Sequence, residues 1–156
     1  MNEHRIAPSL FPIRSAQYSD LDALVALYQH LRPRDDPPPA RPLLEQCWAD
    51  IVGRPGLTCL VVPHDRILIS TTTLIVVPNL TRGTRPYAFI ENVVTHSEFR
   101  RQGIGTAVIN RALDIAWSAN CYKVMLLTGQ RPEQRRFYES CGFKADDKLG
   151  FVARPA

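Results

Sequence analysis

Two repeating patterns of apolar and polar residues divide the chain into predicted helices and strands. Where apolar residues recur every three or four positions, they line one face of a helix, and the pattern predicts an amphipathic helix. Four segments have this spacing: residues 21–31, 43–52, 104–119 and 132–141. Each is long enough to pack one apolar face on a sheet.

Segments rich in β-branched and other apolar residues predict the strands. They are residues 11–14, 57–62, 66–77, 87–95, 122–127 and 143–152, the last as a strand or a hairpin. The order of strands and helices predicts an α/β (mixed α+β) fold. We expect a mixed, mostly antiparallel sheet of six or seven strands with helices on both faces.

Several ends of these elements carry their own signals. Residues 19–22 (Ser-Asp-Leu-Asp) resemble a capping box at the start of the first helix, which Pro33 would stop. Pro132 suits the first turn of the last helix, and Gly142 suits the left-handed position after it. Residues 34–42 contain four prolines and form either a linker or a loop over a site.

The size and composition of the chain fit a globular protein. At 156 residues it is expected to form one domain, residues 1–156, with residues 1–10 as a flexible leader. No apolar run approaches the roughly 20 residues that cross a bilayer. The first residues also lead into no apolar segment of the kind found in signal peptides. We therefore expect a cytoplasmic protein without membrane association.

The cysteines, histidines and net charge narrow the range of ligands. Cys47, Cys59, Cys121 and Cys141 form no C-x-x-C pair and have no histidine at zinc-binding spacing. Reduced thiols and no metal are therefore expected. The net charge of +4 favours anionic ligands, including nucleotides. Because the basic residues are mostly spread out, no nucleic acid is expected as a partner.

Residues 100–106 (Arg-Arg-Gln-Gly-Ile-Gly-Thr) join the predicted strand 87–95 to the helix that follows. Backbone N–H groups point outward at a helix N-terminus, and such a loop suits a phosphate. The dinucleotide pattern G-x-G-x-x-G does not fit, because position 108 is Val. The Gly-Lys-Ser/Thr of a P-loop is also absent. A loop that needs glycine for backbone reasons alone remains the alternative.

Two separate motifs resemble the GNAT superfamily of N-acetyltransferases. Arg100, Gly103 and Gly105 match its pyrophosphate motif, R/Q-x-x-G-x-G/A. Its second marker is a helix end of the form F-Y-x-x-x-G-F, matched from Phe137 to Phe143. The resemblance implies the GNAT fold for the predicted mixed sheet.

Two strand segments are similar to one branch of that superfamily, the glucosamine 6-phosphate N-acetyltransferases. Residues 90–94 (I-E-N-V-V) resemble its I/V-E-D-V-V strand, and residues 120–124 (N-C-Y-K-V) resemble its N-C-Y-K-I segment. Asn92 stands where the branch has Asp, and residues 125–128 lack the acidic residue that the branch has there. The resemblance covers roughly residues 57–152.

The resemblance implies acetyl-CoA as the cosubstrate. In the superfamily this donor lies between two splayed parallel strands, where Val93 and Val94 would hydrogen-bond its pantetheine. Backbone amides of the glycine loop would bind its pyrophosphate. Gln134 matches a position that contacts CoA in relatives, or else it is simply an exposed helix residue. The expected donor-binding residues are Val93, Val94, Arg100, Arg101, Gln102, Gly103, Ile104, Gly105, Thr106 and Gln134.

Two residues are candidates for proton transfer. Glu91 is a candidate general base, acting through water, or else a structural carboxylate. Tyr138 matches the superfamily tyrosine whose hydroxyl points at the sulfur of CoA, so it is a candidate general acid. Its alternative role is a core aromatic residue beside Phe137.

The function implied is transfer of an acetyl group from acetyl-CoA to the primary amine of a small molecule, such as an amino sugar phosphate. A protein or aminoacyl-tRNA acetyltransferase is an alternative, suggested by the basic charge. A non-catalytic sensor of acyl-CoA is another. Family habit implies a homodimer. The sequence does not identify the acceptor amine.

Overall fold

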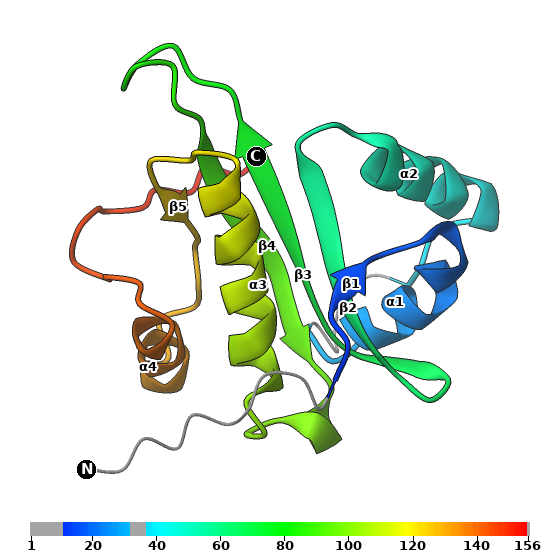
Figure 1. The fold of residues 1–156 in the computed structure, drawn as a ribbon. Helices are drawn as coiled ribbons and strands as arrows, with labels where there is room; N and C mark the ends of the chain where they lie inside the picture. The colour runs from blue at the N-terminus through cyan, green and yellow to red at the C-terminus, as the bar shows by residue number, and fades with distance from the viewer. Residues whose placement is uncertain (1–10, 32–36, 156) are drawn as a thin grey trace. The chain divides into compact units, whose positions relative to one another are not determined.

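The computed structural model describes residues 11–31 and 37–155. They form two compact units, the first ending at Met125 and the second beginning at Leu126. The first contains a sheet and three α-helices, and the second contains α4 (Pro132–Ser140) and the tail after it (Figure 1). The predicted leader, the helix stop at Pro33 and residues 34–36 lie outside the described residues.

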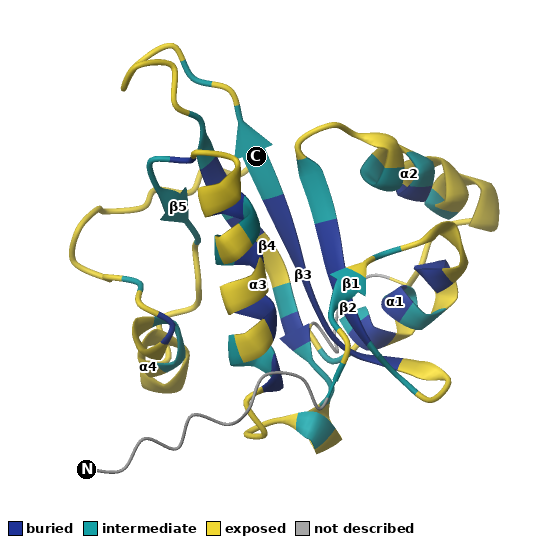
Figure 2. Cartoon of the chain, in the orientation of Figure 1, coloured by how far each residue is buried: buried dark blue, intermediate teal, exposed yellow. Residues whose placement is uncertain are grey.

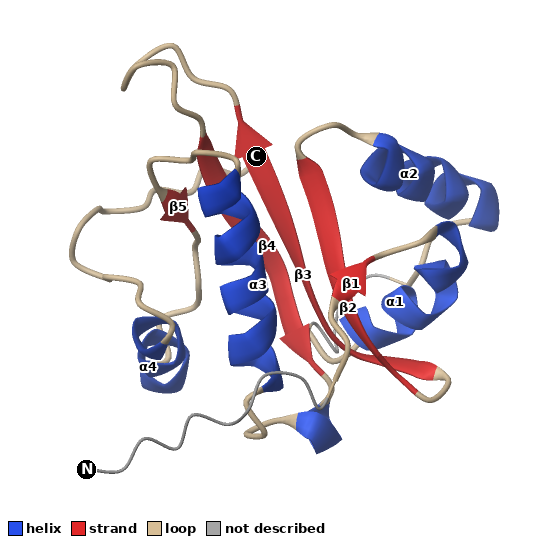
Figure 3. Cartoon of the chain, in the orientation of Figure 1, coloured by secondary structure: helices blue, strands red, loops and turns tan. Residues whose placement is uncertain are grey.

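One sheet forms the centre of the first unit, and Figure 3 draws it in red. Its strands are β1 (Arg14–Ser15), β2 (Leu57–His64), β3 (Ile67–Val77), β4 (Tyr87–Thr95) and β5 (Val124–Met125). They lie in chain order, with antiparallel pairing from β1 to β4 and parallel pairing between β4 and β5. The predicted mixed, mostly antiparallel sheet is confirmed.

The predicted number of strands is wrong, because the described chain forms five rather than six or seven. Residues 143–152 form no strand, and Leu149, Phe151 and Val152 are 80%, 85% and 62% exposed. A strand needs a neighbouring strand to pair its backbone groups. Residues 126–155 include no strand, so this tail finds no partner within its own unit.

Helices cover both faces of the sheet, as predicted. They are α1 (Leu21–Tyr28), α2 (Arg41–Gly53) and α3 (Ile104–Ser118). Leu27 of α1 and Trp48 of α2 pack on Val61 of β2 in one buried cluster. On the other face α3 contacts β2, β3 and β4, and Figure 2 shows buried residues along this helix. Val108 and Ile109 of α3 are fully buried. Apolar packing on both faces therefore holds β4 and α3 in place within the first unit.

The start of α1 differs from the predicted capping box at residues 19–22. A 3₁₀ turn (Tyr18–Asp20) precedes the helix, and the Asp20 side chain makes no cap to α1. Its carboxylate instead accepts hydrogen bonds from both terminal nitrogens of Arg14, at 2.7 and 2.8 Å, and from the Gln17 N–H at 2.7 Å. The Arg14 guanidinium holds the pKa of Asp20 below its usual value. Asp20 thus ties β1 to α1.

Candidate functional site

A β-bulge interrupts β4 at its centre. Thr71 pairs with Val94 and Thr73 pairs with Glu91, so two residues of β4 stand opposite Thr72. One of the two, Asn92, has a φ of 52°. Asn tolerates this left-handed conformation better than most residues, which explains why the chain can bulge here.

The edge of β4 beyond the bulge is open. β4 pairs with β5 only through Ala88 and Phe89. Along residues 90–95, no described strand pairs with that edge. The backbone N–H and C=O groups that point to this edge can bind an extended, amide-bearing ligand as a further strand would. Val93 and Val94, the residues predicted to bind pantetheine, belong to this stretch.

The glycine loop leads directly into α3. Arg101 and Gly103 have φ angles of 61° and 78°, and Gly103 is the N-cap of α3. The first helical hydrogen bond runs from the Ala107 N–H to the Gly103 carbonyl at 2.9 Å. The N–H groups of Ile104, Gly105 and Thr106 therefore have no acceptor within the helix. Such a terminus suits an anion such as a pyrophosphate.

The side chains of this loop hold it in place. The Arg100 guanidinium donates from Nε to the Thr95 carbonyl at 3.0 Å and from Nη2 to the His30 carbonyl at 3.3 Å. Gln102 donates from Nε2 to the Glu98 carbonyl at 3.2 Å. Arg100 therefore ties the loop to β4 and to the residues after α1. The side chain of Arg101 is exposed.

Glu91 lies on β4 immediately before the bulge. Its cross-strand partner is Thr73, so both side chains lie on the same face of the sheet. Glu91 is exposed, and a bridging water can therefore reach its carboxylate. Beside Thr73, burial raises the pKa of the Tyr28 phenol, which keeps that group neutral.

Tyr138 lies in the last turn of α4, in the second unit. The Gly142 N–H donates to the Glu139 carbonyl at 3.0 Å, and the Phe143 N–H donates to the Tyr138 carbonyl at 3.1 Å. With Gly142 at a φ of 91°, these two bonds form a Schellman motif. The rings of Phe143 and Phe137 have centroids 6.1 and 4.9 Å from that of Tyr138. This packing fixes the direction of the half-buried tyrosine.

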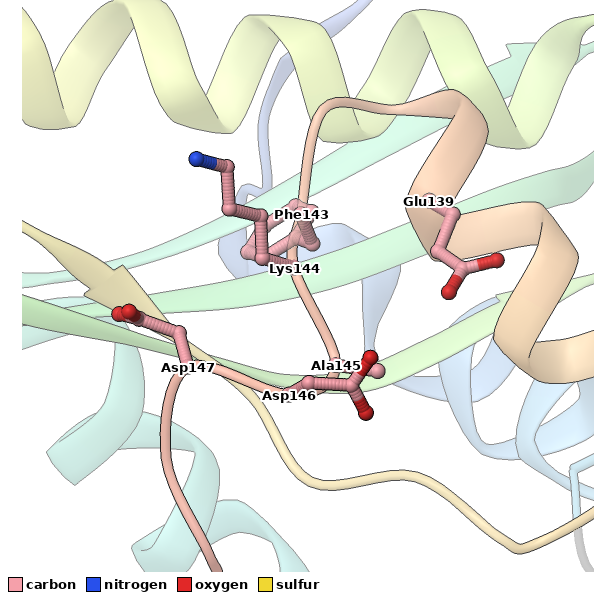
Figure 4. A pocket seen from close by; sticks show the side chains of 6 residues that line it. All are labelled: Glu139, Phe143, Lys144, Ala145, Asp146 and Asp147. Carbon is pink, nitrogen blue, oxygen red and sulfur yellow. The ribbon is translucent and has the colours of Figure 1, made fainter.

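Gln134 lies one turn before Tyr138 on α4 and is exposed. Its amide oxygen is so close to Gly129 that a Cβ there would lie 2.5 Å from it. A hollow in the same unit is lined by Glu139, Asp146 and their neighbours (Figure 4). Both carboxylates pair with Arg135, at 2.8 and 3.0 Å. The hollow thus contains both acidic and basic side chains, and none of the predicted site residues lines it.

The structure thus gathers the predicted residues into two groups. Glu91, Val93 and Val94 belong to β4, and residues 100–106 connect that strand to the start of α3 in the same unit. Gln134 and Tyr138 lie on α4 in the second. The buried hydroxyls of Ser70 and Thr72 in β3, which bond to β4 on either side of the bulge, were not predicted from the sequence. Four consecutive Ser and Thr residues inside an apolar strand were the available signal.

Nucleophilic thiols and metal ligands do not form a site in residues 11–31 and 37–155. No group of three His, Cys, Asp or Glu side chains gathers there. Cys47, Cys59 and Cys121 form no disulfide among the described residues, and burial raises the pKa of the Cys59 and Cys121 thiols, so neither of these two is activated. Cys121 and Cys141 are both buried, which fits a packing role.

Comparison with known proteins identifies the family. The model of the acetyltransferase (GNAT) family matches residues 21–143. The chain belongs to this family. It is therefore an acetyl-CoA-dependent N-acetyltransferase, as the two motifs implied. The matched residues extend through both compact units.

Individual relatives of this acetyltransferase agree with that assignment. It is 31% identical to a glucosamine 6-phosphate N-acetyltransferase of Trypanosoma brucei brucei, over 87% of this chain and 90% of the relative. A protein of the same name from Schizosaccharomyces pombe is 33% identical, over 48% of this chain and 66% of the relative. The solved structure of a putative acetyltransferase from Agrobacterium tumefaciens superposes with a TM-score of 0.87 at 46% sequence identity. The match covers 92% of this chain and 99% of that one.

The described helices of the acetyltransferase lack the length and apolar content of a membrane span. The longest, α3, carries a polar face alongside its buried one.

Proposed function

We propose that the protein transfers the acetyl group of acetyl-CoA directly to the primary amine of a small amino sugar phosphate, with glucosamine 6-phosphate as the first acceptor to test. One observation carries the donor part of this proposal. The open edge of β4 leads, within one compact unit, into the free N–H groups at the start of α3. Pantetheine amides fit the first feature, and a pyrophosphate fits the second.

The acceptor part rests on the relatives and on local sequence. The two relatives described above carry the name of a glucosamine 6-phosphate acetyltransferase. The segments 90–94 and 120–124 resemble that branch. The basic net charge of +4 also favours a phosphorylated acceptor.

The residues of this chain would divide the chemistry as follows. The amine nitrogen attacks the thioester carbonyl, and the carbon–sulfur bond breaks. Glu91 accepts the proton lost by the amine through a bridging water, and Tyr138 donates a proton to the leaving thiolate. The N–H groups at the start of α3 hold the donor, with Gln134 as a further contact. No covalent enzyme intermediate is required.

The test is release of free CoA from acetyl-CoA with a panel of amines: glucosamine 6-phosphate, glucosamine, polyamines, amino acids and peptides. We expect the fastest release with glucosamine 6-phosphate, and slower release with glucosamine because it lacks the phosphate. Faster turnover of a peptide or polyamine would contradict the proposed acceptor. Tight acetyl-CoA binding without turnover of any amine would indicate a sensor instead.

We also propose that the enzyme acts as a cytoplasmic homodimer in which both compact units form one functional domain. The match of the family model to residues 21–143 supports the single domain. The exposed apolar side chains of Leu149 and Phe151 suit a protein interface. Cys47, Cys59 and Cys121 form no disulfide among the described residues, which suits a reducing compartment. Sedimentation equilibrium should give twice the chain mass of 17.6 kDa, and a monomer would contradict the dimer.

A further inference from the structure

A run of four hydroxyl side chains is buried in the middle of the sheet. Ser70, Thr71 and Thr72 of β3 are fully buried, and Thr73 is 8% exposed. A buried hydroxyl is costly unless it is hydrogen-bonded, so each of these groups needs a partner. Their partners show which part of the fold they support.

The hydroxyls of Ser70 and Thr72 bind β4 on either side of its bulge. Thr72 Oγ1 donates to the Glu91 carbonyl at 3.3 Å, and Ser70 Oγ donates to the Val94 carbonyl at 3.0 Å. Ser70 Oγ also lies 3.0 Å from Thr95 Oγ1. The Thr72 bond therefore ends at Glu91, before the bulge, and the Ser70 bonds end at Val94 and Thr95, after it.

The hydroxyl of Thr71 instead bonds to β2, the strand on the other side of β3 from β4. Its Oγ1 donates to the Leu60 carbonyl of β2 at 2.7 Å and lies 3.6 Å from Cys59 Sγ. Thr71 and Thr72 are therefore equally buried and bonded to backbone carbonyls, but only Thr72 reaches the bulge. The chain thus supplies its own matched control.

The bulge explains why side-chain bonds are needed there. With two residues of β4 opposite Thr72, the ladder of backbone hydrogen bonds is locally disrupted. The hydroxyls of Ser70 and Thr72 satisfy the carbonyls at both ends of the bulged segment. They thereby fix its position from the β3 side, while the other edge stays open over residues 90–95.

We propose that Thr72 and Ser70 are positioning residues that hold the bulged segment of β4 in the geometry that binds the donor. This inference rests on the proposed function, because the donor edge of β4 is part of it. Without the Thr72 hydroxyl, the Glu91 carbonyl would lose a partner and the bulge could relax toward a regular strand. The open edge would then present its N–H and C=O groups in the wrong places.

The experiment compares Thr72→Val, Thr72→Ser and Ser70→Ala with Thr71→Val as the control, all in the full-length protein. The first readout needs no ligand: amide hydrogen exchange of peptides that cover residues 87–96 and residues 57–64. We expect faster exchange in β4 for Thr72→Val and Ser70→Ala. We expect faster exchange in β2 for Thr71→Val, and wild-type exchange for Thr72→Ser.

The second readout is the dissociation constant of acetyl-CoA by calorimetry, together with kcat and KM. Thr72→Val should weaken acetyl-CoA binding about tenfold and raise its KM similarly, with a smaller change in kcat. Thr72→Ser should restore binding, and Thr71→Val should bind as the wild type does. The two valine variants should lower the melting temperature by similar amounts, so general destabilisation cannot account for a difference in binding.

Each result bears on a different claim. Unchanged exchange in β4 for Thr72→Val would show that the hydroxyl does not hold the bulge, and would overturn the inference. Faster exchange with unchanged acetyl-CoA binding would also overturn it, because the bulge geometry would then not matter for the donor. If the wild type binds no acetyl-CoA, the proposed function fails and the positioning role fails with it, while the exchange data still show whether the hydroxyls hold the bulge.

Discussion

At the scale of single residues, backbone conformation shapes the proposed donor site. Asn92, Arg101 and Gly103 have positive φ angles, and all three lie between the bulge and the start of α3. Most L-residues avoid this region because Cβ crowds the following carbonyl, whereas Gly has no Cβ and Asn tolerates the strain. Strained backbone of this kind concentrates at binding sites, where the surrounding structure holds it.

Replacing Asn92 tests the cost of the bulge. Asn92→Ala should lower the free energy of unfolding by about 1 kcal/mol, because Ala adopts a positive φ less readily. Asn92→Gly should cost less, since Gly adopts this conformation freely. Chemical denaturation of the three proteins measures both effects. A glycine variant less stable than the alanine variant would show that the φ angle is not what selects Asn here.

Removing the carboxylate of Asp20 tests the link between β1 and α1. Asp20→Asn should lower the free energy of unfolding at neutral pH by about 2 kcal/mol, because the neutral amide has one acceptor oxygen and cannot form the bidentate ion pair with Arg14. Asp22→Asn is the control, since Asp22 is 78% exposed in its pair with Arg41 and should cost little. An equal loss in both variants would contradict the special role of Asp20.

The same ion pair predicts a pH dependence. The pKa of Asp20 is lower in the folded protein than its ordinary value of 3.8. The unfolded chain therefore binds the proton more readily, so this stabilisation is full above that value and is lost as the pH falls through the lower one. Acid unfolding should be less steep in Asp20→Asn than in the wild type.

At the scale of elements, the end of α4 shows why its motif has the form F-Y-x-x-x-G-F. Gly142 supplies the left-handed residue of the Schellman motif, and the following Phe143 packs back on Tyr138. Most residues of the motif therefore serve to end the helix and to orient Tyr138. It is informative about function because of the residue that it orients.

A comparison of two glycines tests this helix end. A Cβ added to Gly142 or to Gly53 would meet no atom within 4 Å, but only Gly142 has a positive φ. Gly142→Ala should therefore cost about 1 kcal/mol of strain, and Gly53→Ala in α2 should be neutral or slightly stabilising. Hydrogen exchange of residues 132–143 measures the first effect, and thermal unfolding measures the second. A neutral Gly142→Ala would contradict the capping role.

At the scale of the whole molecule, the two candidates for proton transfer belong to different units. Glu91 lies in the unit that ends at Met125, and Tyr138 lies in the unit that begins at Leu126. The family model extends through both. The proposed role of each residue is tested by its own variant.

Tyr138→Phe removes the proposed acid and keeps the ring that packs on Phe137 and Phe143. We expect kcat to fall about 100-fold, with acetyl-CoA binding preserved. Tyr18→Phe, at a tyrosine that is 62% exposed, is the control and should keep wild-type activity. An unchanged kcat in Tyr138→Phe would show that the thiolate takes its proton from another source.

Glu91→Gln removes the proposed base. Its rate should be lost at low pH and recover partly as the pH rises, because a larger fraction of the acceptor amine is then already deprotonated. Asp65→Asn, in the exposed turn between β2 and β3, is the control. A pH profile of Glu91→Gln that parallels the wild type would remove the base role.

The sequence predicted the identity and order of most elements because their patterns are local. Periodicity placed α3 and the strands β2 to β4 within a few residues of their observed ends. Gly142 and Pro132 correctly marked the ends of α4. The last predicted strand is wrong because strand formation depends on a partner, and residues 126–155 contain no strand with which residues 143–152 could pair.

By itself, the sequence determined the family and the donor, because the glycine loop and the end of α4 are short, continuous motifs. The backbone conformation of each motif requires specific residues, such as Gly103 and Gly142, that can be recognised in the sequence. Tertiary structure decided what depends on partners distant in the chain. The pairing of Thr72 with a bulge at Asn92, and the attachment of Arg100 to Thr95 and His30, join residues from separate elements. Such contacts leave no periodic trace in the sequence, because hydrogen-bond partners are chosen by register and packing.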